Sequence, residues 1–154
     1  MNDRQYLKLA VEQAKKSVKA NGFPAGAVIV KDGNIISEGI SVGFINHDPT
    51  GHPETVAIRE ACRKLKVSNL EGAVMFESLE CCNMCFSVAY WAGISKIVYA
   101  CRKTLEMIKK FYYEGTMSNE PINESNNRKI ELVFIPDFEQ NMLEIIKEWE
   151  KKNG

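Results

Sequence analysis

Three potential metal ligands and one carboxylate occur in two short stretches of the chain. His52 and Glu54 lie two positions apart, and Cys82 and Cys85 lie three positions apart. A structural zinc site uses four protein ligands, whereas a catalytic site uses three and leaves a position open for water. With one histidine and two cysteines as ligands, Glu54 remains free to take and return a proton. The two stretches therefore predict a catalytic centre with one zinc per chain.

The residues around these groups predict how they are held. Pro53 disfavours a helical backbone at His52 and itself suits the first position of a helix. We therefore expect His52 to cap a helix over residues 53–65, with Glu54 in its first turn and both side chains facing one metal. The two cysteines are expected one turn apart at the start of a helix over residues 82–92. There the helix dipole and the metal both favour the thiolate form.

Composition limits the class of protein. The 154 residues suit a single domain, expected to cover residues 1–154. Twenty basic and twenty acidic residues give a formal net charge of zero, which favours a small, free substrate but does not exclude a nucleic acid bound by a local basic patch. No apolar run is long enough to span a bilayer, and no signal peptide is evident. We expect a cytoplasmic protein without a membrane partner.

Strand and helix patterns alternate along the chain, which predicts an α/β fold with helices covering a sheet. An Asp-Gly turn at Asp32 and Gly33 predicts that the first two strands form a hairpin. Residues 114–129 are polar and predict a surface loop or mobile flap. Expected helices cover residues 4–20, 53–65, 82–92, 104–110 and 137–151, and expected strands cover residues 27–30, 35–39, 71–78, 96–100 and 130–135.

The order of the motifs resembles the cytidine and deoxycytidylate deaminase superfamily, whose signature is His-x-Glu followed by Pro-Cys-x-x-Cys. Similar blocks at residues 24–33, 48–54, 57–59, 79–85 and 90–92 extend the resemblance over much of the chain. Within the superfamily the chain is most similar to the small guanine deaminases and next to the bacterial tRNA adenosine deaminases. The resemblance implies a three-layer α/β/α sandwich with a mixed five-stranded sheet, and a homodimer.

The resemblance also implies a reaction. Hydroxide formed at the zinc would attack the ring carbon that bears an amino group, Glu54 would pass the proton to a ring nitrogen, and ammonia would leave. We therefore expect a zinc-dependent hydrolytic deaminase of a free nucleobase or related amino-heterocycle, with a guanine-type base or its nucleoside as the small-molecule partner. Two alternatives stay open: a tRNA adenosine deaminase, and a zinc-stabilised binding module that has lost catalysis.

The substrate positions depart from the family pattern more than the metal positions do. Family members usually have Asn in place of Ser41, Phe in place of Ala25 and Pro in place of Cys81. Tyr113 stands where guanine deaminases have an Asp that assists proton transfer, and the chain lacks their terminal aromatic residue. These departures leave the identity of the base open. The candidate substrate contacts implied by the resemblance are Ser41, Ala25, Cys81, Trp91, Tyr113 and Glu114.

Other reactive side chains are expected to lie outside the metal site. His47, the only other histidine, is interpreted as a polar loop residue. Cys62 and Cys101 are interpreted as core thiols, because free cysteines are among the most frequently buried residues. Five cysteines are an odd number, and two of them are assigned to metal, so a disulfide framework is not expected.

Overall fold

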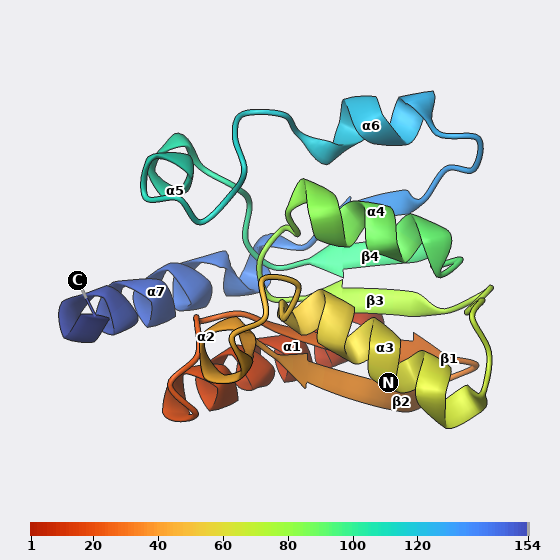
Figure 1. Cartoon of the computed structure of the whole chain (residues 1–154), viewed down its shortest axis with the longest axis horizontal. Coiled ribbons are helices and arrows are strands. Elements are labelled where there is room, and N and C mark those ends of the chain that lie inside the picture. The colour runs from red at the N-terminus through yellow and green to blue at the C-terminus, as the bar shows by residue number, and fades with distance from the viewer. Residues whose placement is uncertain (154) are drawn as a thin grey trace.

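The computed structural model describes residues 1–153 and places helices on both faces of one five-stranded sheet (Figure 1). The strand order is β2-β1-β3-β4-β5. β1 runs antiparallel to β2 and β3, whereas β3, β4 and β5 run parallel to one another. The predicted α/β fold with a mixed five-stranded sheet is confirmed. The strands are β1 (Gly26–Lys31), β2 (Asn34–Ile40), β3 (Val74–Glu77), β4 (Lys96–Tyr99) and β5 (Glu131–Phe134).

The helices form the two outer layers. In Figure 1, α3 and α4 lie in front of the sheet and α1 lies behind it, with α7 running out beside α1. None of the helices within residues 1–153 is long and apolar enough to cross a membrane. The helices are α1 (Asp3–Lys19), α2 (Gly43–Asn46), α3 (Pro53–Leu65), α4 (Asn83–Trp91), α5 (Leu105–Lys109), α6 (Asn119–Ser125) and α7 (Glu139–Asn153), and a 3₁₀ turn, η1 (Pro136–Phe138), precedes α7.

Local sequence rules account for the first layer. Asn2 caps α1 by accepting the backbone N–H of Gln5, and the Gln5 side chain accepts the Asn2 N–H in return, which forms a capping box. Asp32 and Gly33 both have positive φ, 52° and 76°, as the tight turn of a twisted hairpin requires. The predicted Asp-Gly hairpin between β1 and β2 is therefore confirmed.

A continuous apolar core fills the space between the sheet and both helical layers. Ile29, Phe76 and Ile97 of the central strands are fully buried, as are Leu7 of α1 and Phe86 of α4. Each such side chain contributes about 1.5–3 kcal/mol through removal of its apolar surface from water. This core fixes α3 and α4 against the sheet, so that the starts of both helices have defined positions.

The structure corrects two local predictions and adds one helix. The polar segment 114–129 is not only loop, because it contains α6. The predicted strand over residues 71–78 is shorter, since Gly72 has a φ of 87° and forms a turn before β3 begins. The short helix α2 was not predicted. α6 shows no apolar periodicity; its Asn123 instead donates to the carbonyl oxygen of Ile130 and accepts the N–H of that residue.

Candidate active site

The starts of two helices meet on one side of the sheet. His52 is the N-cap of α3, with an extended backbone (φ −79°, ψ 152°), and Pro53 opens the helix as predicted. The buried Thr55 hydroxyl donates to the His52 carbonyl oxygen at 2.9 Å, which fixes this turn. Gly39 of β2 allows the close approach of the helix, because a Cβ at this position would lie 2.1 Å from the Pro53 carbonyl oxygen. Cys82 is the extended N-cap of α4.

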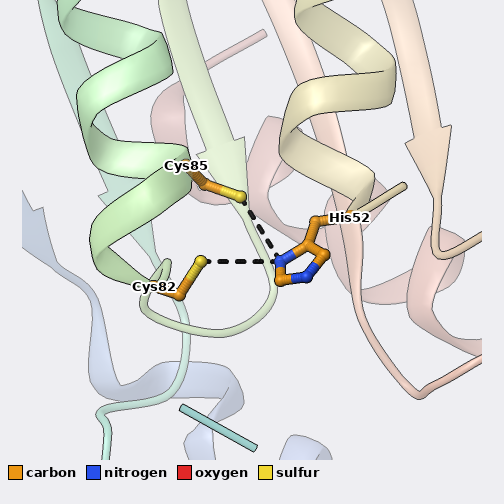
Figure 2. A group of neighbouring side chains, drawn as sticks. All are labelled: His52, Cys82 and Cys85. Atoms are coloured by element: carbon orange, nitrogen blue, oxygen red, sulfur yellow. Dashed lines mark hydrogen bonds between the residues drawn. The ribbon is translucent and has the colours of Figure 1, made fainter. Parts of the chain in front are cut away.

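The imidazole and both thiols converge at this point (Figure 2). Nδ1 of His52 lies 3.5 Å from Sγ of Cys82 and 3.5 Å from Sγ of Cys85. All three potential ligand atoms lie within 4.8 Å of one another. Zn–S and Zn–N bonds of about 2.3 Å and about 2.05 Å at a tetrahedral angle would separate sulfur from nitrogen by about 3.5 Å. The donor set and its spacing therefore fit zinc, with His52, Cys82 and Cys85 as the residues that would hold it.

Glu54 lies in the first turn of α3 and contributes to the same cavity. Its side chain is almost completely buried. Burial raises the pKa of Glu54 from 4.5 to about 7, and the charge of Cys82 adds to this effect, whereas His52 and Cys85 lower it. A carboxyl group with a pKa near neutrality can accept and return protons at physiological pH.

The two thiols differ in their ease of ionisation. The hydrogen bond from Cys85 and, against the effect of burial, the hydrogen bond from His52 lower the pKa of the Cys82 thiol to about 5. The hydrogen bond to Cys82 and burial raise the pKa of Cys85 well above its usual value. One negative charge is thus shared within the pair, and a bound divalent cation stabilises the second thiolate.

A cavity of about 890 Å³ opens beside this cluster. Five of the predicted substrate residues line it: Ser41, Ala25, Cys81, Tyr113 and Glu114. Trp91 is the exception among the described residues 1–153, since its side chain is 79% exposed at the end of α4 and does not contribute to the cavity wall. Within one chain the structure therefore gives no support for the predicted contact between Trp91 and substrate.

The side chains of Tyr113 and Glu114 both form hydrogen bonds with backbone groups. The Tyr113 hydroxyl donates to the carbonyl oxygen of Glu80 at 2.5 Å. The Glu114 carboxylate accepts the backbone N–H groups of Asn83 and Met84, at 3.3 Å and 3.1 Å. These contacts with the backbone N–H groups of α4 contribute to a lowered pKa of Glu114, against the effect of burial.

An aromatic wall, formed by Phe23, Tyr112 and Trp149, was not predicted. The ring centroids lie 5.0 Å apart for Phe23 and Tyr112, 5.2 Å apart for Phe23 and Trp149, and 6.0 Å apart for Tyr112 and Trp149. All three side chains line the cavity. Helix α7 of the same chain brings Trp149 to the cavity. The aromatic character of these residues was visible in the sequence, but their proximity was not.

Two further residues lie near the site, and neither was predicted to be part of it. His47 lies in the αL conformation after α2, as a loop residue, and it also lines the cavity. Glu77 ends β3 as a completely buried carboxyl whose Oε1 accepts the Cys81 N–H at 2.9 Å, while Oε2 has no hydrogen-bond partner among the described residues 1–153. Burial raises the pKa of Glu77 well above 4.5, and the charge of Glu54 adds to this effect. The sequence offered one signal for Glu77, namely a Glu at the end of an apolar strand.

Of the remaining cysteines, Cys101 is buried and Cys62 is partly buried.

Comparison with known proteins assigns the central part of this site to one family. Residues 1–101 match the cytidine and deoxycytidylate deaminase zinc-binding region, a stretch that contains His52, Glu54, Cys82 and Cys85. Guanine deaminase of Bacillus subtilis (strain 168) is 44% identical over 105 residues, which span 68% of this chain and 67% of that protein.

One further relative and one solved structure are also similar to this chain. A tRNA-specific adenosine deaminase of Aquifex aeolicus (strain VF5) is 38% identical over 100 residues, which span 65% of this chain and 66% of that protein. An X-ray structure of guanine deaminase from Bacillus subtilis has a TM-score of 0.68 at 32% identity, covering 98% of this chain and 95% of the other. The matched stretches of the two curated relatives thus span about two thirds of their length.

Proposed function

The chain belongs to the cytidine and deoxycytidylate deaminase family, a zinc-binding deaminase family, and from that premise we propose that it hydrolytically deaminates a free nucleobase or related amino-heterocycle. A guanine-type base is the first candidate, with one zinc held per chain by His52, Cys82 and Cys85. The observation that carries the proposal is the buried Glu54 beside the three ligand atoms, in a cavity with an aromatic wall.

Glu54 is the acid/base residue in this proposal. When bound, zinc acts as a Lewis acid that makes water a nucleophile at neutral pH. Glu54, with a pKa raised to about 7, accepts a proton from the attacking water and returns it to a ring nitrogen of the substrate. Burial keeps this carboxyl group out of bulk water, so that the proton is passed to the substrate. The alternative hypothesis of a zinc-stabilised binding module without catalysis would leave this buried carboxyl group without a role.

The cavity supports an uncharged, flat substrate. Aromatic rings at Phe23, Tyr112 and Trp149 offer apolar faces and edges to a planar heterocycle. Lys110 is the only lysine or arginine among the residues that line the cavity within residues 1–153, and its ammonium group is paired with Glu106 and Glu150. A phosphate group would therefore find no free cationic partner here, whereas a neutral base requires none.

Deamination of adenosine in tRNA is the second candidate. It is supported by the 38% identity with the tRNA-specific adenosine deaminase of Aquifex aeolicus. The zero net charge of this chain argues against it, because phosphate contacts supply most of the affinity for nucleic acids. Incubation with an adenosine-containing anticodon stem-loop at moderate salt, followed by nucleoside analysis for inosine, tests this candidate directly.

The test of the proposed chemistry is the Glu54→Gln variant. Its side chain has nearly the same size but cannot accept the proton, so ammonia release should fall by about 10²–10⁴-fold. Zinc content, measured on the same preparation, should stay at the wild-type level because Glu54 is not a ligand. Ammonia release at the wild-type rate would exclude Glu54 as the acid/base group. The homodimer and the cytoplasmic location stay predictions.

A further inference from the structure

The segment between α5 and α6 contacts the start of the helix that carries both cysteines. Glu114 spans the first two backbone N–H groups of α4, with Oε1 on Asn83 and Oε2 on Met84. The N-terminal N–H groups of a helix have no partner within the helix and favour a negatively charged acceptor. Glu114 therefore supplies α4 with a cap from a residue about 30 positions away in the sequence.

Helix α4 needs such a cap because its own N-cap side chain does not provide one. Cys82 occupies the N-cap position, where Ser, Thr, Asp or Asn usually satisfies an N–H group. The Cys82 side chain makes no such cap hydrogen bond. The two N–H groups between the cysteines are satisfied by Glu114.

Asn119 completes the contact from the other end of the segment. Its side-chain amide donates to the Cys81 carbonyl oxygen at 2.9 Å, and its side-chain oxygen accepts from the Asn83 amide at 3.0 Å. The Asn83 amide also donates to the Met117 carbonyl oxygen at 3.1 Å. Asn119 is 4% exposed. Residues 114–119, which we term the α4 clasp, thus contact the backbone on both sides of Cys82.

We propose that Glu114 and Asn119 are positioning residues for the metal site, and that the α4 clasp holds Cys82 and Cys85 at the spacing that zinc requires. This inference rests on the proposed zinc site. Groups that orient metal ligands commonly change metal affinity by about 10–100-fold when removed. The α4 clasp acts at the lower end of this range, because Glu114 is exposed and binds the backbone next to the ligands.

The same contacts assign Glu114 a role different from that of a proton donor to substrate. Both carboxylate oxygens accept backbone N–H groups, and a charged acceptor makes such hydrogen bonds stronger than a neutral one does. Protonation of Glu114 would weaken both contacts at the start of α4. The resemblance to guanine deaminases left open whether Glu114 replaces their second catalytic carboxylate, and the α4 clasp favours a positioning role.

The experiment compares zinc affinity among variants of the full chain, measured by competition with a chelator of known affinity. Glu114→Ala and Asn119→Ala should each weaken zinc binding by about tenfold. Glu114→Gln should weaken it less, because one amide oxygen can still accept an N–H group. Glu124→Gln is the matched control, since this exposed residue of α6 lies outside the clasp. Its zinc affinity should equal that of the wild type.

A second measurement distinguishes positioning from general stabilisation. Thermal unfolding of the metal-free variants reports any loss of stability that is independent of zinc, and a purely structural role would appear only there. Unchanged zinc affinity in both alanine variants would overturn the proposal. So would normal zinc affinity in Glu114→Gln together with a large loss of ammonia release and an altered pH profile. Zinc affinity is measurable whether or not the wild type deaminates a base, so failure of the proposed reaction would be recognised separately.

Discussion

The cavity has a metal side, which carries the three potential zinc ligands, and an aromatic wall. These two sides are built differently. On the metal side, His52, Cys82 and Cys85 project from the starts of two helices that the core fixes in place. On the other side, Phe23 and Trp149 come from opposite ends of the chain and are only partly buried. The side proposed to supply the chemistry is fixed by the core, whereas the side proposed to contact the rest of the substrate depends on a few surface contacts.

Those surface contacts attach the end of α7 to the segment after α5. The carboxylate of Glu150 accepts the Tyr112 hydroxyl at 2.5 Å and the Lys110 ammonium group at 2.9 Å. Exposed ion pairs of this kind contribute little to stability. We infer that substitutions in the aromatic wall of this chain leave the metal side intact, and variants on each side test this separation of roles.

The largest expected effect comes from the metal side. Cys85→Ala removes one of three ligands, so zinc should be lost on dialysis and ammonia release should fall to background. The near-ultraviolet circular dichroism, which reports the packing of all aromatic side chains, should persist, since the aromatic wall is built from segments outside α4. A variant that keeps zinc and activity would show that another residue completes the site. Collapse of the aromatic signal would show that the two sides are not separable.

A second effect concerns Glu77, the buried carboxyl group at the end of β3 that accepts the Cys81 N–H. Its raised pKa in the fold means that the native state binds more protons than the unfolded state once the pH exceeds about 4.5. The free energy of unfolding should therefore fall as pH rises from 4.5 toward the folded pKa of Glu77, by up to about 1.4 kcal/mol per pH unit.

Glu77→Gln should remove the part of this pH dependence that Glu77 contributes, because an amide does not ionise and its oxygen can still accept the Cys81 N–H. Urea unfolding at several pH values, with zinc saturation held constant, measures the difference between the two proteins. The advantage of the variant should grow with pH. Parallel stability profiles would show that Glu77 ionises in the fold at its usual pKa.

A smaller effect is expected from the aromatic wall. Trp149→Ala should raise KM by about tenfold, since stacking of a base on an aromatic ring contributes about 1–3 kcal/mol. Both kcat and zinc content should change little. The matched variant Trp91→Ala removes the same side chain outside the cavity and should change KM by less than about twofold. A large increase for Trp91→Ala would indicate that a second copy of the chain brings Trp91 to the substrate.

The sequence predicts the metal side because each step rests on a local rule. Pro53 after His52 identifies a helix start, and the three-residue spacing of the cysteines places both thiols in one turn. The family signature covers the same residues. The hairpin between β1 and β2 likewise follows from a short-range pattern, and this prediction was confirmed.

The aromatic wall and the α4 clasp depend on contacts between distant segments. Phe23 contacts Trp149 only after α7 has packed beside α1, and no sequence periodicity predicts that contact. Asn119 lies in a polar segment that composition alone marks as loop, yet it is buried against Cys81. Polar residues held by tertiary hydrogen bonds leave no apolar pattern in the sequence, so α6 and its contacts were missed.

The central claim is that the cavity deaminates a free base. Its most direct test measures ammonia release by zinc-quantified protein from guanine, adenine, cytosine and their nucleosides, beside inosine formation in an anticodon stem-loop. We predict turnover of at least one free base, with a kcat/KM far above that for the stem-loop, and loss of this activity in Glu54→Gln. Inosine formation in the stem-loop with no turnover of any base, or no reaction at all in zinc-loaded protein, would contradict the account.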